Sequence, residues 1–219
     1  KIKIIPNGIN IHEFLISNKL SRLEYLKKFT KKSHSHKHVI TSMGRIHEKK
    51  GFDILITSFN NLVLDGFIGV LLIAGKDDGH QALLEKKVTE YKLEDKVFFV
   101  GELFGNDKVE FLSGSDLFAL PSHNENFGNV YLESLACGVP IVASTETPWS
   151  KIEKAGCGRW VENSVSSTTK AIKEIFKECN DESKKLKITE ASKKFATSYS
   201  WQTIATKFRD LCSEIIKSH

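Results

Sequence analysis

Short apolar runs alternate with amphipathic stretches along the chain, and this alternation restricts its possible folds more than any other feature. Runs rich in Val, Ile, Leu and Phe predict strands at 38–44, 69–75, 96–101, 116–122, 140–144 and 158–161. Apolar residues at helical spacing predict helices at 51–65, 80–93, 107–115, 129–138, 166–179, 182–197 and 201–217. Because strands that are apolar throughout need cover on both faces, the sequence predicts an α/β fold with a doubly wound parallel sheet and extra C-terminal helices.

The first residues predict one more strand, at 2–5, and position 1 is lysine rather than methionine. We therefore expect a fragment of a longer protein that begins at a domain edge. With 219 residues, 40% of them hydrophobic and 27% charged, the chain is long enough for one large domain with its own core. It has no apolar run of the roughly 18 residues that would predict a membrane span.

The net charge of +5 is spread along the chain and suits a small anionic ligand or a loose attraction to an acidic membrane surface. Basic stripes with interleaved aromatic residues are absent, which argues against nucleic acid as a partner. Isolated reduced thiols are expected at Cys137, Cys157, Cys179 and Cys212, since their spacing fits neither a metal site nor a redox motif. The alternating histidines at 34, 36 and 38 leave metal binding open, but a polar connector is the favoured reading, and no metal is expected.

Ligands of doubly wound sheets bind beyond the carboxyl ends of the strands. The loops expected there are 43–51, 75–79, 101–107, 121–128 and 144–149. The first of them, GRIHEKKG, offers Arg45 and Lys50 beside a helix start, which is a plausible clamp for a diphosphate. Two ordinary surface cations are the alternative. Neither a G-x-G-x-x-G nor a P-loop pattern occurs, so a dinucleotide dehydrogenase or an ordinary kinase is disfavoured.

The loop PSHNENFGN brings a carboxylate, Glu125, to the start of the next predicted helix, and Gly128 would let a ligand approach the backbone closely. Glu133 follows one to two turns into that helix, where it could accept both hydroxyls of a ribose. With the cations across the crevice, this set predicts a nucleotide-sugar site. Taken singly, Glu133 could be a solvated helix residue and Glu125 a carboxylate favoured by the helix dipole.

The segment PSHNENFGNVYLESLACGVPIVAS resembles the signature of retaining glycosyltransferases of the GT-B fold, group 1 type (family 4). Glu125 and Glu133 match the pair of glutamates that the family separates by seven residues. The segments IIPNGINIHEF and GRIHEKKGFDILITSF also resemble family segments, and the resemblance covers about residues 1–179 in order. It implies a Rossmann-like, donor-binding C-terminal half of a GT-B enzyme.

Such enzymes transfer a sugar from a nucleotide diphosphate to a hydroxyl with retention, usually without a metal. The resemblance implies that Gly44, Arg45 and Lys50 bind the leaving diphosphate, and that Glu125 holds donor sugar hydroxyls. Glu133 would bind the ribose. Other substrate-binding residues implied by the match are Glu102 and Leu103 at the base, Lys108 near the phosphates, and Asn126, Phe127, Gly128 and Asn129 beside the sugar. The expected donor is a UDP- or GDP-sugar, with no further cofactor.

The resemblance further implies a cytoplasmic enzyme of bacterial cell-envelope polysaccharide synthesis, with a glycan or lipid-linked acceptor. Peripheral association with the inner face of the membrane is left open. Residues 1–180 would form the nucleotide-sugar-binding domain. Residues 181–219 would form helices that pack on an N-terminal acceptor domain missing from this chain, so the chain alone is expected to bind nucleotide but transfer little sugar.

Two departures from the family pattern stand out. An acidic residue commonly follows the proline in the loop after the Val-Ala-Ser strand, whereas TETPWSKI has Trp149 and Ser150 there. Without the acceptor domain, the last helix is expected to expose an apolar face. The residues of that face are Trp201, Ile204, Phe208, Leu211 and Ile215.

Two alternatives remain beside the glycosyltransferase. One is a sugar epimerase or phosphorylase of the same architecture, although no lysine for pyridoxal phosphate can be identified. The other is a non-catalytic nucleotide-sugar-binding module that serves as an interaction partner, since this architecture supports many activities.

Overall fold

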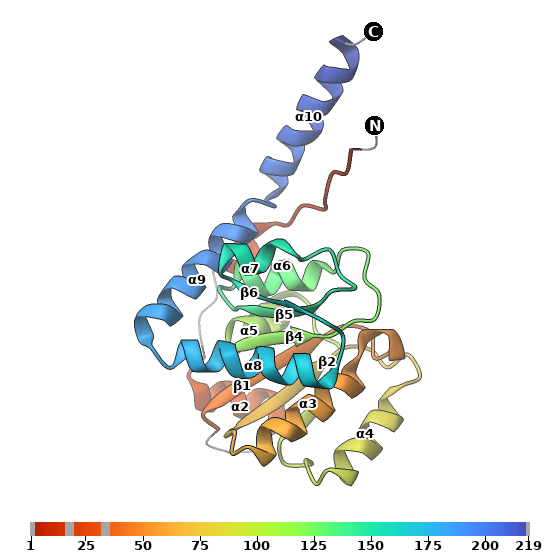
Figure 1. The fold of residues 1–219 in the computed structure, drawn as a ribbon, viewed down its shortest axis with the longest axis vertical. Helices are drawn as coiled ribbons and strands as arrows, with labels where there is room; N and C mark the ends of the chain where they lie inside the picture. Colours follow the sequence, from red (N-terminus) through yellow and green to blue (C-terminus); the bar gives the residue numbers. More distant parts are fainter. Residues whose placement is uncertain (1–2, 16–19, 32–35, 218–219) are drawn as a thin grey trace.

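The computed structural model describes residues 3–15, 20–31 and 36–217, which form a six-stranded parallel sheet covered by helices on both faces (Figure 1). The strands are β1 (His38–Met43), β2 (Gly69–Ala74), β3 (Val97–Gly101), β4 (Leu117–Leu120), β5 (Ile141–Ser144) and β6 (Gly158–Val161). The helices are α1 (Ile11–Leu15), α2 (Arg22–Thr30), the 3-10 helix η1 (Glu48–Lys50), α3 (Phe52–Leu64), α4 (Gln81–Glu90), α5 (Gly105–Ser113), α6 (Asn129–Ala136), α7 (Lys151–Ala155), α8 (Val165–Cys179), α9 (Glu182–Thr197) and α10 (Trp201–Lys217).

The strand order is β3-β2-β1-β4-β5-β6, and every pair is parallel. The chain runs outward from β1 to β3, returns to the centre, and continues through β4 to β6. Its direction therefore reverses between β1 and β4, which is the place where doubly wound sheets bind their ligands. The predicted doubly wound α/β fold is confirmed.

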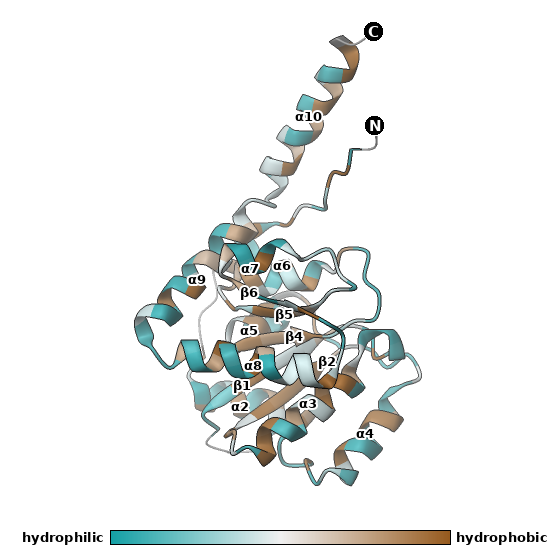
Figure 2. Ribbon diagram, viewed as in Figure 1, coloured by the Kyte–Doolittle hydropathy of each residue, from teal (hydrophilic) through white to brown (hydrophobic). Residues whose placement is uncertain are grey.

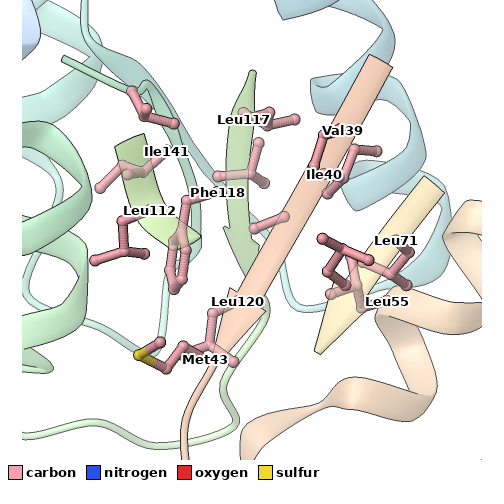
Figure 3. Close-up of a cluster of buried hydrophobic side chains, with 14 of the residues drawn as sticks. Val39, Ile40, Met43, Leu55, Leu71, Leu112, Leu117, Phe118, Leu120 and Ile141 are labelled. Carbon is pink, nitrogen blue, oxygen red and sulfur yellow. The ribbon is translucent and has the colours of Figure 1, made fainter. Parts of the chain in front are cut away.

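The core follows from the continuous apolar character of the central strands. All residues of β2, β4 and β5 are buried, as are five of the six residues of β1. In Figure 3, Leu55 of α3 lies beside Leu71 of β2, and Leu112 of α5 lies near Phe118 of β4 and Ile141 of β5. Figure 2 shows the same division, with the hydrophobic strands inside and more hydrophilic residues on the outer helices.

The two chain ends leave the domain side by side. The main chain of Ile9 forms an isolated parallel bridge with Ser200, and α10 projects away from the sheet beside the N-terminal segment (Figure 1). The strand predicted at 2–5 is wrong for residues 3–5, which lie outside the sheet, and Ile4 is 88% exposed. Residue 2 lies outside the described residues.

The apolar face predicted for the last helix is confirmed in part. Trp201, Phe208 and Ile215 are exposed, and Leu211 is half-buried. Ile204 is buried, because the root of α10 packs on the domain, so its predicted exposure is wrong. By contrast, α9 packs against α6 and α7. None of the helices in the described part of the chain combines the length and apolar character needed to cross a bilayer.

One close backbone approach joins the loops that follow β1 and β4. Gly51 has φ of +67°, and a Cβ atom at this position would lie 2.0 Å from the carbonyl oxygen of Pro121. Only glycine fits here, because any side chain would separate the two loops.

We expect Gly51→Ala to lower the free energy of unfolding by roughly 2–5 kcal/mol, because it adds both left-handed strain and a clash. Urea denaturation measures this loss. Gly79→Ala is the matched control, since Gly79 also has positive φ but open space around its Cβ position. It should cost about 1 kcal/mol. Equal losses in the two variants would show that the contact with Pro121 does not matter.

Candidate functional site

The loops after β1 and β4 meet at the crevice between these strands. Besides the contact of Gly51 with Pro121, the backbone N–H of His123 donates to the carbonyl oxygen of Lys49 at 2.8 Å. The phenol of Tyr131 donates to the carbonyl oxygen of Leu120 at 2.7 Å. Burial raises the pKa of Tyr131 well above its ordinary value, so this phenol remains a donor at any physiological pH. These contacts hold the two predicted loops together at the carboxyl edge of the sheet.

The predicted pair Lys50 and Glu125 forms an ion pair across the two loops. His47 caps the start of the short helix η1, and its Nδ1 accepts a hydrogen bond from the backbone N–H of Lys49 at 3.1 Å. This turn directs Lys50 past Gly44 toward the carboxylate. The side chains of Lys50 and Glu125 are only 19% and 16% exposed, so solvent screens their attraction less than at the open surface.

Arg45 lies at the outer margin of the same region. Its guanidinium donates to Asp78 at 2.9 Å, and its side chain is 73% exposed. Arg45 and Lys50 nevertheless line one hollow of about 340 Å³. We call it the switch-point hollow, because the strand order of the sheet reverses between β1 and β4. The complete lining is Arg45, His47, Lys49, Lys50, Asn124, Glu125 and Asn126. Three basic side chains face one carboxylate there, which favours an anionic ligand.

Helix α6 begins immediately beside this hollow. Gly128 is its N-cap with φ of +72°, and a Cβ there would meet the Tyr131 ring at 2.8 Å and Cγ of Glu125 at 2.9 Å. The backbone N–H groups of Gly128, Asn129 and Val130 donate to no residue that the structure describes. Free amides at a helix start are suited to a negatively charged group. The Asn129 side chain instead accepts a hydrogen bond from Asn7 at 3.2 Å.

Glu133 lies one turn into α6 and is 13% exposed. Its Oε1 accepts a 2.6 Å hydrogen bond from Nζ of Lys108 on α5. Its Oε2 is buried without a partner among the described residues. The structure thus brings Lys108 to the predicted ribose-binding carboxylate. The second carboxylate oxygen is thus unsatisfied among the described residues and enclosed by protein atoms.

Glu102 and Leu103 lie directly after β3, as predicted, in the loop that leads to α5. The Leu103 side chain lines a separate hollow with β3 and the end of α2. Their neighbour Phe104 is 69% exposed at the N-cap of α5, and the sequence analysis did not single it out. The sequence signal for this residue was a phenylalanine in a predicted loop at the carboxyl edge of the sheet.

Trp149, which the sequence analysis noted only as a departure, is 1% exposed and supports the second loop. Its indole Nε1 donates to the carbonyl oxygen of Phe127 at 2.8 Å. A buried indole usually needs such an acceptor, so its presence in a loop was a usable signal. The position of that acceptor, 22 residues earlier, could not be predicted from the sequence.

Within the described residues, no group of three or more His, Cys, Asp or Glu side chains is placed to hold a metal ion. His34 of the histidine-rich stretch lies outside those residues. The four cysteines form no disulfide among the described residues, and burial raises the pKa of the Cys157 thiol to about 12. That thiol therefore stays protonated at physiological pH.

The chain is similar to known glycosyltransferases in sequence and in fold. The family model for "Glycosyl transferases group 1" matches residues 26–195. The capsular polysaccharide biosynthesis glycosyltransferase CapM of Staphylococcus aureus is 28% identical over 141 residues, which is 64% of this chain and 35% of CapM. The chain thus spans about a third of this curated relative.

Two solved structures share the fold at low sequence identity. Anabaena HepE in complex with UDP has a TM-score of 0.78 at 22% identity, covering 97% of this chain and 57% of HepE. The C-terminal domain of the group 1 glycosyl transferase LpcC from Francisella tularensis has a TM-score of 0.71 at 20% identity. That match covers 89% of this chain and all of the LpcC domain. Since the family model matches more than three quarters of the chain, the protein belongs to the group 1 glycosyltransferases.

Proposed function

We propose that this chain is the C-terminal, donor-binding half of a retaining GT-B glycosyltransferase of family 4, which uses a nucleotide diphosphate sugar without a metal. The observation that carries the proposal is the Lys50–Glu125 pair in the switch-point hollow, which Arg45 also lines. The likeness to HepE bound to UDP and to an isolated C-terminal domain supports it. The similarity to CapM supports a role in envelope polysaccharide synthesis.

The ion pair of Lys50 and Glu125 suits a donor that carries an anion next to hydroxyl groups. Without ligand, each charge has the other as its partner, so neither is buried alone. A bound donor would replace both partners, with a phosphate oxygen for Lys50 and a sugar hydroxyl for Glu125. After the exchange, Lys50 would face the phosphate charge, and the Glu125 carboxylate would accept hydrogen bonds from the sugar.

Negative charge grows on the diphosphate as the sugar departs. Lys50, Arg45 and the free amides at the start of α6 are positioned around one region and would stabilise that charge. Glu133 would hold the ribose through its carboxylate, which pairs with Lys108 in the ligand-free domain. Transfer itself would require an acceptor domain that closes over the crevice.

Titration of the chain with UDP, GDP and their sugar conjugates tests the proposal directly. We expect saturable binding by calorimetry that is unchanged by EDTA, because the charge is neutralised by side chains and amides. The preferred base would identify the donor class. A complete lack of binding, in this chain and in the full-length protein, would refute the nucleotide-sugar assignment.

Lys50→Gln should weaken UDP by about tenfold or more while changing uridine less than twofold, since Lys50 would contact the phosphates and not the nucleoside. Lys86→Gln on α4 is the control, because Lys86 is exposed and does not line the hollow. It should leave both affinities unchanged. Equal losses for UDP and uridine in Lys50→Gln would contradict the diphosphate role.

Glu133→Gln should weaken UDP by roughly 1–3 kcal/mol through the loss of charge-assisted hydrogen bonds to the ribose. An analogue that lacks both ribose hydroxyls separates this role from a general effect. The wild-type chain should bind the analogue less tightly than UDP, and Glu133→Gln should bind both about equally. If the variant still discriminates as the wild type does, Glu133 does not bind the ribose.

A further inference from the structure

The buried indole of Trp149 lies in an aromatic group beneath the second loop of the site. Its ring centroid is 5.0 Å from Phe127, 5.8 Å from Tyr131, 5.9 Å from Tyr199 and 6.3 Å from Phe195. These contacts fix the indole on the side of the loop opposite to solvent, and its one polar atom reaches the Phe127 carbonyl oxygen at 2.8 Å.

That hydrogen bond determines the orientation of a neighbouring donor. The carbonyl of Phe127 and the N–H of Gly128 belong to one peptide unit, which is planar and trans. In a trans peptide these two groups point in opposite directions. Because the indole draws the carbonyl inward, the Gly128 N–H is turned away from Trp149, and it donates to no described residue.

Glycine makes this orientation easy to lose. Gly128 lacks a Cβ and adopts φ of +72° and ψ of +76°, so its backbone can rotate more freely than that of other residues. If the peptide flipped, a carbonyl oxygen would take the place of the N–H at the start of α6. An oxygen there would repel an anion, whereas the N–H attracts one.

We propose that Trp149 is a positioning residue, whose indole N–H locks the Phe127–Gly128 peptide so that the Gly128 amide faces the phosphates of the donor. This inference rests on the proposed nucleotide-sugar site. It assigns Trp149 a directional role in addition to packing.

The chain contains a matched control for the test. The indole of Trp160 also donates to a loop carbonyl, that of Thr147, at 3.0 Å. Trp149→Phe and Trp160→Phe each remove one such N–H and keep an aromatic ring. Only the first of these bonds holds the peptide that carries the Gly128 amide.

We expect Trp149→Phe to weaken UDP about tenfold in calorimetry and to change uridine less than twofold. The amide resonance of Gly128 should shift or broaden in this variant. Trp160→Phe should bind both ligands as the wild-type chain does. If Trp149→Phe is too unstable to test, benzothienylalanine introduced at position 149 alone keeps the bicyclic shape, lacks the N–H, and should give the same loss for UDP.

Unchanged UDP binding in a folded Trp149 variant, or equal losses for UDP and uridine, would overturn the positioning role and leave the proposed function intact. A wild-type chain that binds neither UDP nor GDP would instead remove the proposed function, and the positioning role with it. The two failures are therefore distinguishable in one set of titrations.

Discussion

The whole arrangement depends on a sheet whose central strands are buried on both faces. Strands of this kind leave no place for charged side chains along their length, because an unpaired charge in such surroundings is very costly. The only polar side chains buried in β1 are the small hydroxyls of Thr41 and Ser42. Charged groups are thereby confined to the strand ends, and the hollow lined by Lys50 and Glu125 lies beside the point where the strand order reverses.

The charges at that edge occur in complementary pairs. Lys50 and Glu125 connect the loops after β1 and β4, while Lys108 and Glu133 connect α5 and α6. All four side chains are at least 70% covered, so a lone charge at any of them would be unfavourable. Pairing keeps the ligand-free domain stable, and each pair still offers one cation and one carboxylate that a ligand with both phosphates and hydroxyls could satisfy.

The sequence predicted the sheet well, since continuous apolar runs are the strongest signal that a buried strand leaves. The strand prediction failed at residues 3–5, where a similar apolar run forms a segment outside the sheet. An apolar run in the sequence does not reveal whether a partner strand is available. Helix α2 was not predicted, although Ser21 and Glu24 form a capping box that could have been read.

For the site, the sequence predicted that Lys50 and Glu125 lie at the same crevice, because both of their loops follow parallel strands. It could not show that Lys108 lies on Glu133, since that contact depends on how α5 packs beside α6. The support given by Trp149 was hidden for the same reason. Pairings between separate elements are set by packing, whereas the position of a loop is set by topology.

The projecting helix α10 is mechanically a lever. Its 17 residues make it roughly 25 Å long, so a rotation of about 5° at the root moves the far end by roughly 2 Å. Tyr199 lies two residues before α10, and its carbonyl oxygen accepts a hydrogen bond from the backbone N–H of Ile9 at 2.9 Å. The Tyr199 ring packs against both Trp149 and Phe127. The root of the lever is therefore connected to the aromatic group that supports the loop after β4, so a displacement of α10 would act on that group.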